Sequence, residues 1–202
     1  MTSWEKYSDA APNWSEEQYA DTRAYLSHRG ELVRTLGPPL DEGDVVLDLA
    51  CGDGALADFL PGLRYVGVDA SAEMVAAGRA RGRDIVHADL NEFAPVQPVQ
   101  ATTIFRAIYY AHDRVALLRR IAAYTETKLV FDLNPRQYRL DDVRADLRAA
   151  GFDELATRPF FVPQTRSFRL LTRLERSGPL ARLVLRYRFT ILCSASRRAA
   201  AS

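Results

Sequence analysis

One short stretch constrains the fold of this chain more than any other: residues 45–56, with the sequence VVLDLACGDGAL. Its first part, Val45–Leu49, is a run of branched apolar residues, which is typical of a strand buried on both faces. Gly52 and Gly54 follow, and Asp53 is placed to cap a helix that we expect to start at Gly54. Because glycine allows a tight turn and the close approach of a ligand, this strand, turn and helix N-terminus predict a nucleotide-binding site.

A second acidic residue follows another short apolar run. Tyr65-Val66-Gly67-Val68 leads into Asp69, about 20 residues after the first strand, the offset at which an acid can bind ribose hydroxyls. A carboxylate accepts hydrogen bonds from both hydroxyls of an unphosphorylated ribose and repels a phosphate. The pattern therefore argues against NADP as the ligand.

Strands and helices are expected to alternate along the chain, which predicts one twisted and mostly parallel sheet in a single domain. The expected strands cover about residues 45–49, 65–69, 84–90, 101–105, 128–132, 157–162 and 180–193. The expected helices cover about residues 15–36, 54–61, 72–80, 114–125 and 140–150. Ser15 is expected to cap the first helix, on which His28 is interpreted as a surface residue. His87 is interpreted as a strand residue with a satisfied ring nitrogen.

Composition excludes several other classes of protein. With 202 residues, 48% of them hydrophobic and 26% charged, the chain suits one soluble domain with a sizeable core. It contains no apolar run of about 18 residues and no secretory pattern at its N-terminus, so we expect no membrane span and a cytoplasmic location. Cys51 and Cys193 are too few for a disulfide framework, and no metal-binding constellation is visible.

In these motifs the chain resembles the class I S-adenosylmethionine-dependent methyltransferases. The first motif of that family reads acid, any, Gly, any, Gly, any, Gly, and this chain has Asp48-Leu49-Ala50-Cys51-Gly52-Asp53-Gly54, with Ala50 in place of the first glycine. The resemblance covers roughly residues 44–152. It implies a doubly wound α/β fold with seven strands, helices on both faces and an antiparallel last strand.

The resemblance also implies a set of cofactor-binding residues. Asp69 would bind the ribose, Met74 would pack on the adenine, Asp89 would accept from its exocyclic amine, and the backbone beside Asp89 would meet a ring nitrogen. The complete set is Asp48, Ala50, Gly52, Gly54, Asp69, Ala70, Met74, Asp89, Leu90, Phe105 and Arg106, the last two flanking the methionine moiety of S-adenosylmethionine.

The methyl acceptor is expected beyond the carboxyl end of the fourth strand, beside Tyr109, Tyr110 and His112. Methyl transfer from a sulfonium is a direct displacement, so a catalytic base is optional. For a hydroxyl acceptor, His112 is our first candidate for the base, and Tyr109, Tyr110 and Asp132 are weaker ones. The alternative for His112 is a helix-capping or surface residue. The family motif Asn/Asp-Pro-Pro-aromatic is missing here, which argues against nucleic-acid bases as acceptors.

The composition of the C-terminal segment suggests what kind of acceptor the protein binds. We divide the single domain into an N-terminal arm and lid helix (1–36), a cofactor-binding core (44–152) and C-terminal strands (153–202). Beyond Thr157 the sequence is rich in arginine and has a single acid, Glu175. We interpret this as a solvated sheet edge with a basic tail, the alternative being an anionic partner. The expected acceptor is a small anionic or aromatic molecule, and the sequence leaves assembly as a homodimer open.

Two other functions fit parts of the pattern. One is an NAD-dependent Rossmann oxidoreductase, although the glycine turn lacks the full Gly-x-Gly-x-x-Gly spacing because Leu56 and Ala57 follow Gly54. The other is a non-catalytic module of the same fold that binds only the cofactor or a partner. The intact acids at positions 48, 69 and 89 argue against such a loss of activity.

Overall fold

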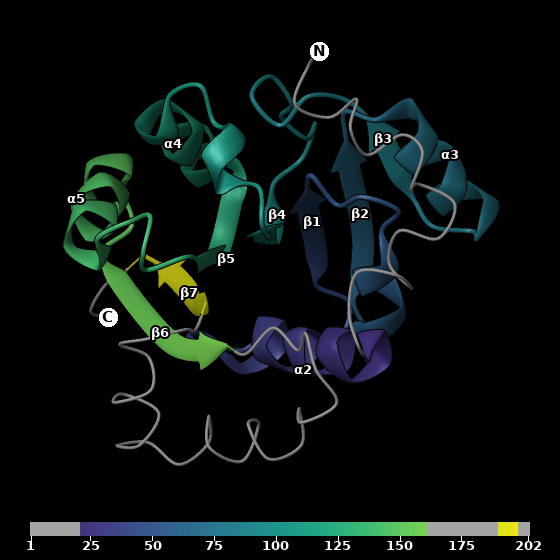
Figure 1. Ribbon diagram of the computed structural model, residues 1–202, viewed down its shortest axis with the longest axis horizontal. Helices are drawn as coiled ribbons and strands as arrows, with labels where there is room; N and C mark the ends of the chain where they lie inside the picture. The colour runs from purple at the N-terminus through teal and green to yellow at the C-terminus, as the bar shows by residue number, and fades with distance from the viewer. Residues whose placement is uncertain (1–20, 161–189, 198–202) are drawn as a thin grey trace.

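The computed structural model describes residues 21–160 and 190–197. Within these ranges the chain forms one seven-stranded sheet with the strand order β3-β2-β1-β4-β5-β7-β6 (Figure 1). The strands are β1 (Val45–Leu49), β2 (Arg64–Asp69), β3 (Ile85–His87), β4 (Val99–Ile104), β5 (Thr125–Leu133), β6 (Glu154–Phe160) and β7 (Thr190–Ser196). The α-helices are α2 (Thr22–Thr35), α3 (Ala72–Ala80), α4 (Arg114–Tyr124) and α5 (Leu140–Ala150), and the 3-10 helices are η2 (Ala55–Phe59) and η3 (Ile108–Tyr110).

The direction of the strands agrees with the prediction from sequence. Strands β1 to β5 pair in parallel, whereas β7 pairs antiparallel with both β5 and β6. The expectation of a mostly parallel seven-stranded sheet with an antiparallel last strand is therefore confirmed. In such a sheet the carboxyl ends of β1, β2, β3 and β4 meet at one edge, which is where ligands bind in open α/β folds.

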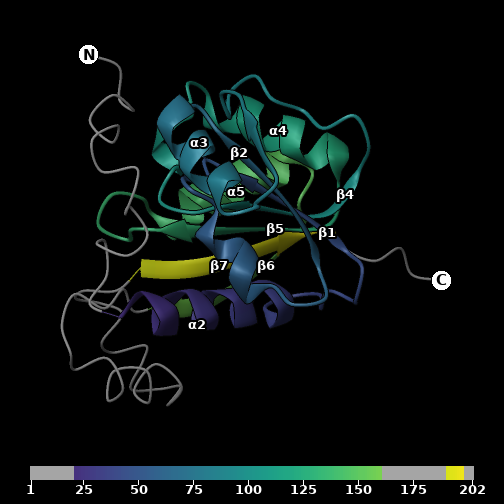
Figure 2. The same cartoon turned by 90° about the vertical axis from the view of Figure 1, so that its right-hand side faces the viewer.

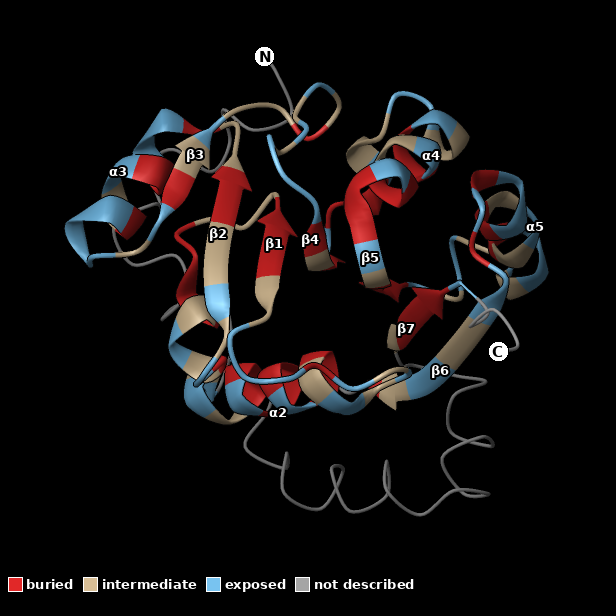
Figure 3. Ribbon diagram, turned by 180° about the vertical axis from the view of Figure 1, so that it is seen from behind, coloured by how far each residue is buried: buried red, intermediate tan, exposed pale blue. Residues whose placement is uncertain are grey.

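Side chains alternate along β1 and divide the core into two layers. Val46 packs in a cluster with residues of α2 and η2, whereas Leu47 and Leu49 belong to the cluster under α4 and α5. Figure 1 shows α2 on one side of the sheet and α4 and α5 on the other, and Figure 3 shows the buried residues concentrated in the central strands and on the helix sides that face them. Because both faces are covered, the strands are apolar on both sides.

Helix α2 begins at Thr22, where the side chain of Asp21 accepts a hydrogen bond from the main-chain nitrogen of Ala24. The predicted cap, Ser15, lies outside the described residues. Figure 2 shows α2 lying along the sheet, close to β6 and β7. His28 is 8% exposed and its ring stacks on Phe160, with centroids 5.4 Å apart. The interpretation of His28 as a surface residue is therefore wrong, because α2 turns this side chain toward the last two strands.

A buried lysine fastens the C-terminal end of α2 to the sheet. The Nζ atom of Lys128 donates to the main-chain oxygens of Arg34 at 3.2 Å and Leu36 at 3.0 Å. Lys128 is fully buried, and burial lowers its pKa to about 8. The lysine thus supplies donors to carbonyl groups that the end of a helix leaves without intrahelical partners.

Several predicted elements differ in their limits. The helix expected from Gly54 is only the 3-10 helix η2, because Gly54 has a left-handed backbone (φ 72°) and β2 begins soon after Pro61. Strand β6 starts at Glu154 because its antiparallel ladder with β7 extends to Ser196. Residues 161–162 and 180–189, which were assigned to the last two strands, lie outside the described residues.

None of the helices in the described ranges combines the length and the apolar character needed to cross a membrane. The same ranges hold no group of His, Cys, Asp and Glu side chains that could bind a metal ion.

The position of α2 depends on Gly30, and this can be tested. A Cβ atom on Gly30 would lie 2.2 Å from the main-chain oxygen of Phe59. In a helix without tertiary contacts, Gly30→Ala would increase the stability of the helix by about 1 kcal/mol. Here we expect it to destabilise the protein by about 1–3 kcal/mol, because α2 must move away from η2. Urea unfolding measures this change, with the exposed Ser27→Ala on the same helix as control. A stabilised Gly30→Ala variant would contradict the packing.

Candidate active site

The turn after β1 has an unusual backbone. Ala50 (φ 56°), Gly52 (φ 62°) and Gly54 (φ 72°) all have left-handed conformations. Glycine adopts this conformation without strain, whereas a residue with a Cβ loses of order 1 kcal/mol. The first glycine of the resembled family falls at position 50, so the structure explains that glycine physically. In this chain Ala50 has the same conformation and is strained.

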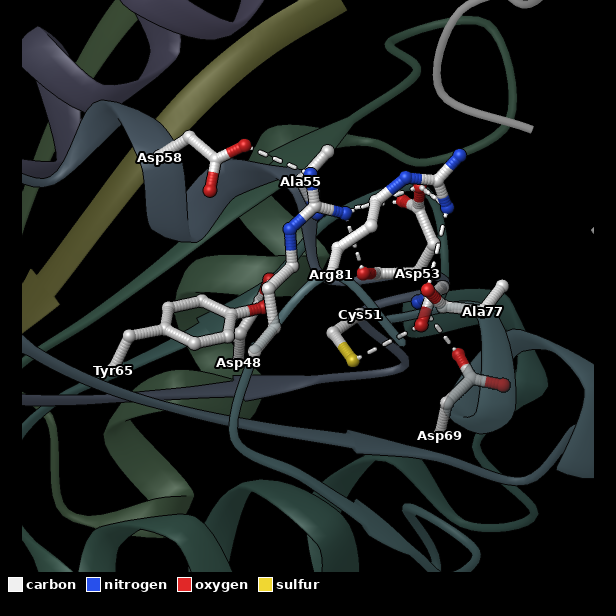
Figure 4. A network of polar contacts seen from close by, with 11 residues as sticks. Asp48, Cys51, Asp53, Ala55, Asp58, Tyr65, Asp69, Ala77 and Arg81 are labelled. Atoms are coloured by element: carbon white, nitrogen blue, oxygen red, sulfur yellow. Dashed lines mark hydrogen bonds and ion pairs between the residues drawn. The ribbon is translucent and has the colours of Figure 1, made fainter. Parts of the chain in front are cut away.

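The turn is held from outside by basic side chains that follow α3 (Figure 4). Asp53 is 2% exposed and forms ion pairs with Arg83 at 3.2 Å and Arg81 at 3.7 Å. Arg83 also donates to the main-chain oxygen of Asp53 at 2.7 Å. Asp53 was expected to cap the following helix, but the N-cap residue of η2 is Gly54, which has no side-chain cap. The Oδ1 atom of Asp53 does accept from the main-chain nitrogen of Ala55 at 3.3 Å, and its arginine contacts were not anticipated.

Asp69 joins the end of β2 to this turn. Its Oδ2 atom accepts from the main-chain nitrogen of Gly52 at 2.7 Å, and its Oδ1 atom accepts from that of Ser71 at 2.9 Å. Burial raises the pKa of Asp69, while the hydrogen bonds with Ser71 and Gly52 act in the opposite direction. Since each carboxylate oxygen has more than one lone pair, Asp69 retains acceptor capacity for ligand hydroxyl groups.

Asp48 lies deeper, near the end of β1. Its Oδ1 atom accepts from the hydroxyl of Thr103 at 2.6 Å and its Oδ2 atom from the hydroxyl of Tyr65 at 2.9 Å. Burial raises the pKa of Asp48 to about 6, despite these two hydrogen bonds and the charge of Arg29. Burial also raises the pKa of the nearby thiol of Cys51, which keeps the thiol protonated and poorly nucleophilic.

The end of β3 is linked to the loop between β4 and α4. The Oδ1 atom of Asp89 accepts from both the main-chain nitrogen (2.7 Å) and the side-chain Nδ2 (2.9 Å) of Asn91. Nδ2 of Asn91 also donates to the main-chain oxygen of Tyr110 at 3.2 Å, and its Oδ1 accepts from the main-chain nitrogen of His112 at 3.0 Å. The side chain of Asn91 thus connects two loops at the same edge of the sheet.

A buried arginine comes from α2. Arg29 is 6% exposed, and its guanidinium lies 4.2 Å from the ring centroid of Phe105 and 4.4 Å from that of Tyr25. It forms an ion pair with Asp132 at 3.8 Å. Asp132 in turn accepts from the main-chain nitrogen of Arg106 at 2.5 Å, at a residue with a left-handed backbone (φ 54°). Burial raises the pKa of Asp132, and Arg29 opposes that shift.

These groups surround one cavity of about 230 Å³ at the carboxyl ends of the central strands. Apart from Gly54, all the residues predicted to bind the cofactor line it: Asp48, Ala50, Gly52, Asp69, Ala70, Met74, Asp89, Leu90, Phe105 and Arg106. The predicted catalytic candidates His112 and Tyr109 line it too, together with Tyr110. Gly54 instead packs near Ile85, whose Cδ1 would lie 2.8 Å from an added Cβ.

Several lining residues were not predicted from the sequence, notably Arg29 and Asn91. Arg29 follows Tyr25 by four residues and precedes Leu32 by three, so it shares the buried side of α2 with them. A charge on the apolar side of a predicted helix was the available signal for Arg29. For Asn91 no such signal existed, since its role depends on two loops that only the folded chain brings together.

The cavity lies where open α/β sheets bind their ligands, and comparison with known proteins adds a match to one family of domains. Residues 46–128 match a family described as "Methyltransferase domain". The trans-aconitate 2-methyltransferase of Azoarcus sp. (strain BH72) is 33% identical over 137 residues, which are 63% of this chain and 53% of that protein. The chain thus spans about half the length of this curated relative.

Solved structures agree on the fold. A putative methyltransferase in complex with the Trm112 methyltransferase activator of Haloferax volcanii has a TM-score of 0.66 and 19% identity, covering 98% of this chain and 99% of that one. Magnesium protoporphyrin IX methyltransferase from Synechocystis PCC 6803, solved with bound SAM, has a TM-score of 0.57 and 17% identity, covering 95% of this chain and 79% of that one. The chain therefore contains a match to a methyltransferase domain over residues 46–128, and its fold is that of solved methyltransferases.

The raised pKa of Asp48 predicts a pH-dependent effect of Asp48→Asn. A carboxyl whose folded pKa is about 6, against about 4 unfolded, adds stability below pH 4 that is lost as the pH rises through 6. We therefore expect Asp48→Asn to stabilise the protein by about 1–3 kcal/mol at pH 7.5 and by nearly nothing at pH 4. Urea unfolding at both pH values measures this, with the exposed Asp84→Asn as control. A gain independent of pH would contradict it.

Proposed function

We propose that this protein transfers a methyl group from S-adenosylmethionine to a small carboxylic acid. One observation carries the proposal. A single cavity at the carboxyl ends of the strands brings together the left-handed turn at residues 50–52 with two acids, Asp69 and Asp89, that follow neighbouring strands. The turn and both acids lie within residues 46–128, the range that matches the methyltransferase domain.

The chemistry of the lining residues fits the parts of the cofactor. Asp69 would accept from the ribose hydroxyls and Asp89 from the exocyclic amine of adenine. The side chains of Met74 and Leu90, both buried, would provide apolar walls for the ring. Phe105 and Arg106 would flank the methionine part. When bound, S-adenosylmethionine supplies an electrophilic methyl group on a sulfonium, and the protein must orient a nucleophile in line with it.

Charge is unevenly distributed around the cavity and favours an acidic acceptor. The acids Asp69 and Asp89 would face the adenosine, whereas Arg29, Arg106 and His112 line the side formed by α2 and the loop after β4. A guanidinium is well suited to bind a carboxylate. The relative from Azoarcus is named for trans-aconitate, which is a tricarboxylic acid, so its name supports the same class of acceptor.

A carboxylate acceptor changes the roles expected of His112 and Tyr109. A carboxylate is already ionised at neutral pH, so it can attack the methyl group without a base. We propose that His112 and Tyr109 contact and orient the acceptor rather than remove a proton from it. Phe105 and the two tyrosines would help to exclude water from the reacting groups.

Calorimetry with S-adenosylhomocysteine tests the cofactor. We expect binding to the wild-type protein and about 10–100-fold weaker binding to Asp69→Ala, because charge-assisted hydrogen bonds of about 1.5–3 kcal/mol are lost. Asp84→Asn, an exposed acid outside the cavity, is the control and should bind like the wild type. Circular dichroism checks that each variant is folded. Absence of binding to the wild type, or tight binding of NAD instead, would overturn the proposed function.

The pH profile of turnover tests the class of acceptor. With trans-aconitate as substrate we expect kcat to vary by less than about 3-fold between pH 6.5 and 8.5. We expect His112→Gln to lower kcat/KM by no more than about 10-fold, the loss that fits one hydrogen bond to the acceptor. If His112 were the base for a hydroxyl acceptor, the variant would lose about 10²–10⁴-fold. Such a loss with a hydroxyl substrate, or absence of turnover with every acid in a panel, would contradict a carboxylic acid acceptor.

A further inference from the structure

The loop between β4 and α4, residues 105–113, is fixed by side chains from other parts of the chain. At its start, Asp132 at the end of β5 accepts from the main-chain nitrogen of Arg106. At its end, the side chain of Asn91 donates to the main-chain oxygen of Tyr110 and accepts from the main-chain nitrogen of His112. Because the loop supplies Phe105, Arg106, Ala107, Tyr109, Tyr110 and His112 to the cavity, these two attachments determine the shape of the acceptor side.

The geometry at Asn91 requires an amide side chain. The carboxylate of Asp89 and the main-chain oxygen of Tyr110 can only accept hydrogen bonds, and the main-chain nitrogen of His112 can only donate one. The two donors of Nδ2 and the acceptor Oδ1 of Asn91 satisfy all three partners at once. An aspartate at this position would lack both donors. Alanine would lack all three side-chain contacts and keep only the main-chain hydrogen bond to Asp89.

We propose that Asn91 is a positioning residue that couples the adenine side of the cavity to the loop that contacts the acceptor. This inference rests on the proposed function, in which Asp89 accepts from the adenine amine. Oδ1 of Asp89 already accepts both hydrogen bonds from Asn91, and within residues 21–160 and 190–197 no group donates to Oδ2. The carboxylate of Asp89 would thus accept from the adenine amine through Oδ2. Through Oδ1 it would contact Asn91, which binds the loop.

The coupling follows from the shared carboxylate. A cofactor that fixes Asp89 also fixes Asn91, and with it the end of the loop near Tyr110 and His112. If the cofactor has already ordered the loop, the acceptor binds without a further loss of conformational entropy. The two ligands then bind with positive coupling. Without the amide, the cofactor would still bind at Asp69 and Asp89, but the loop would no longer respond to it.

Hydrogen exchange measured by mass spectrometry on the peptide that covers residues 105–113 tests the proposal. In the wild type, S-adenosylhomocysteine should slow exchange in this peptide. In Asn91→Ala the peptide should exchange at least about 10-fold faster without ligand, and the ligand should no longer slow it. Calorimetry should still give a dissociation constant within about 3-fold of the wild-type value. Asn134→Ala removes an exposed asparagine whose side chain accepts from the main-chain nitrogen of Arg136 in the same turn, and it should behave like the wild type.

The outcomes separate the inference from the proposed function. If the ligand binds both proteins and slows the loop equally in both, Asn91 does not couple the two sides and the inference fails alone. If the ligand does not bind the wild type, calorimetry shows that the proposed function fails, and the coupling falls with it. If Asn91→Ala loses cofactor binding more than about 10-fold while remaining folded, the residue serves the cofactor site directly and the positioning role is wrong.

Discussion

The site depends on one hydrogen bond, from the main-chain nitrogen of Gly52 to the carboxylate of Asp69. It joins the turn after β1 to the end of β2, and it can form only because the turn has a left-handed backbone at Ala50 and Gly52. The pairing of β1 with β2 in parallel brings the two segments to the same edge. The acid therefore shapes the turn and also lines the cavity.

Buried charge recurs around this centre. Asp48, Asp53 and Asp132 are all at most 5% exposed, and each has partners: two hydroxyls for Asp48, two arginines for Asp53, and Arg29 with the backbone of Arg106 for Asp132. Burying a carboxylate is costly unless it is paired or hydrogen-bonded. These acids tie α2, the turn and the β4–α4 loop to the sheet, so that packing and function share the same contacts.

Much of this could be predicted from local patterns in the sequence. The apolar runs and the glycines led to the strands, and α3 and α4 lie where helices were expected. Each of these two helices begins at a residue whose side chain caps it, Ser71 for α3 and Asp113 for α4. The burial of His28 could not be predicted, since it depends on Phe160 far along the chain. The same holds for Asn91, whose partners lie in two separate loops.

A crystal structure with S-adenosylhomocysteine bound would test the central claim most directly. The account predicts that the adenosine occupies the cavity with its ribose hydroxyls on the carboxylate of Asp69 and its exocyclic amine on Oδ2 of Asp89. It also predicts that the hydrogen bond between Gly52 and Asp69 persists, at the length of 2.7 Å that it has here. A ligand bound elsewhere, or an Asp69 side chain turned away from the sugar, would contradict the account and leave only the fold.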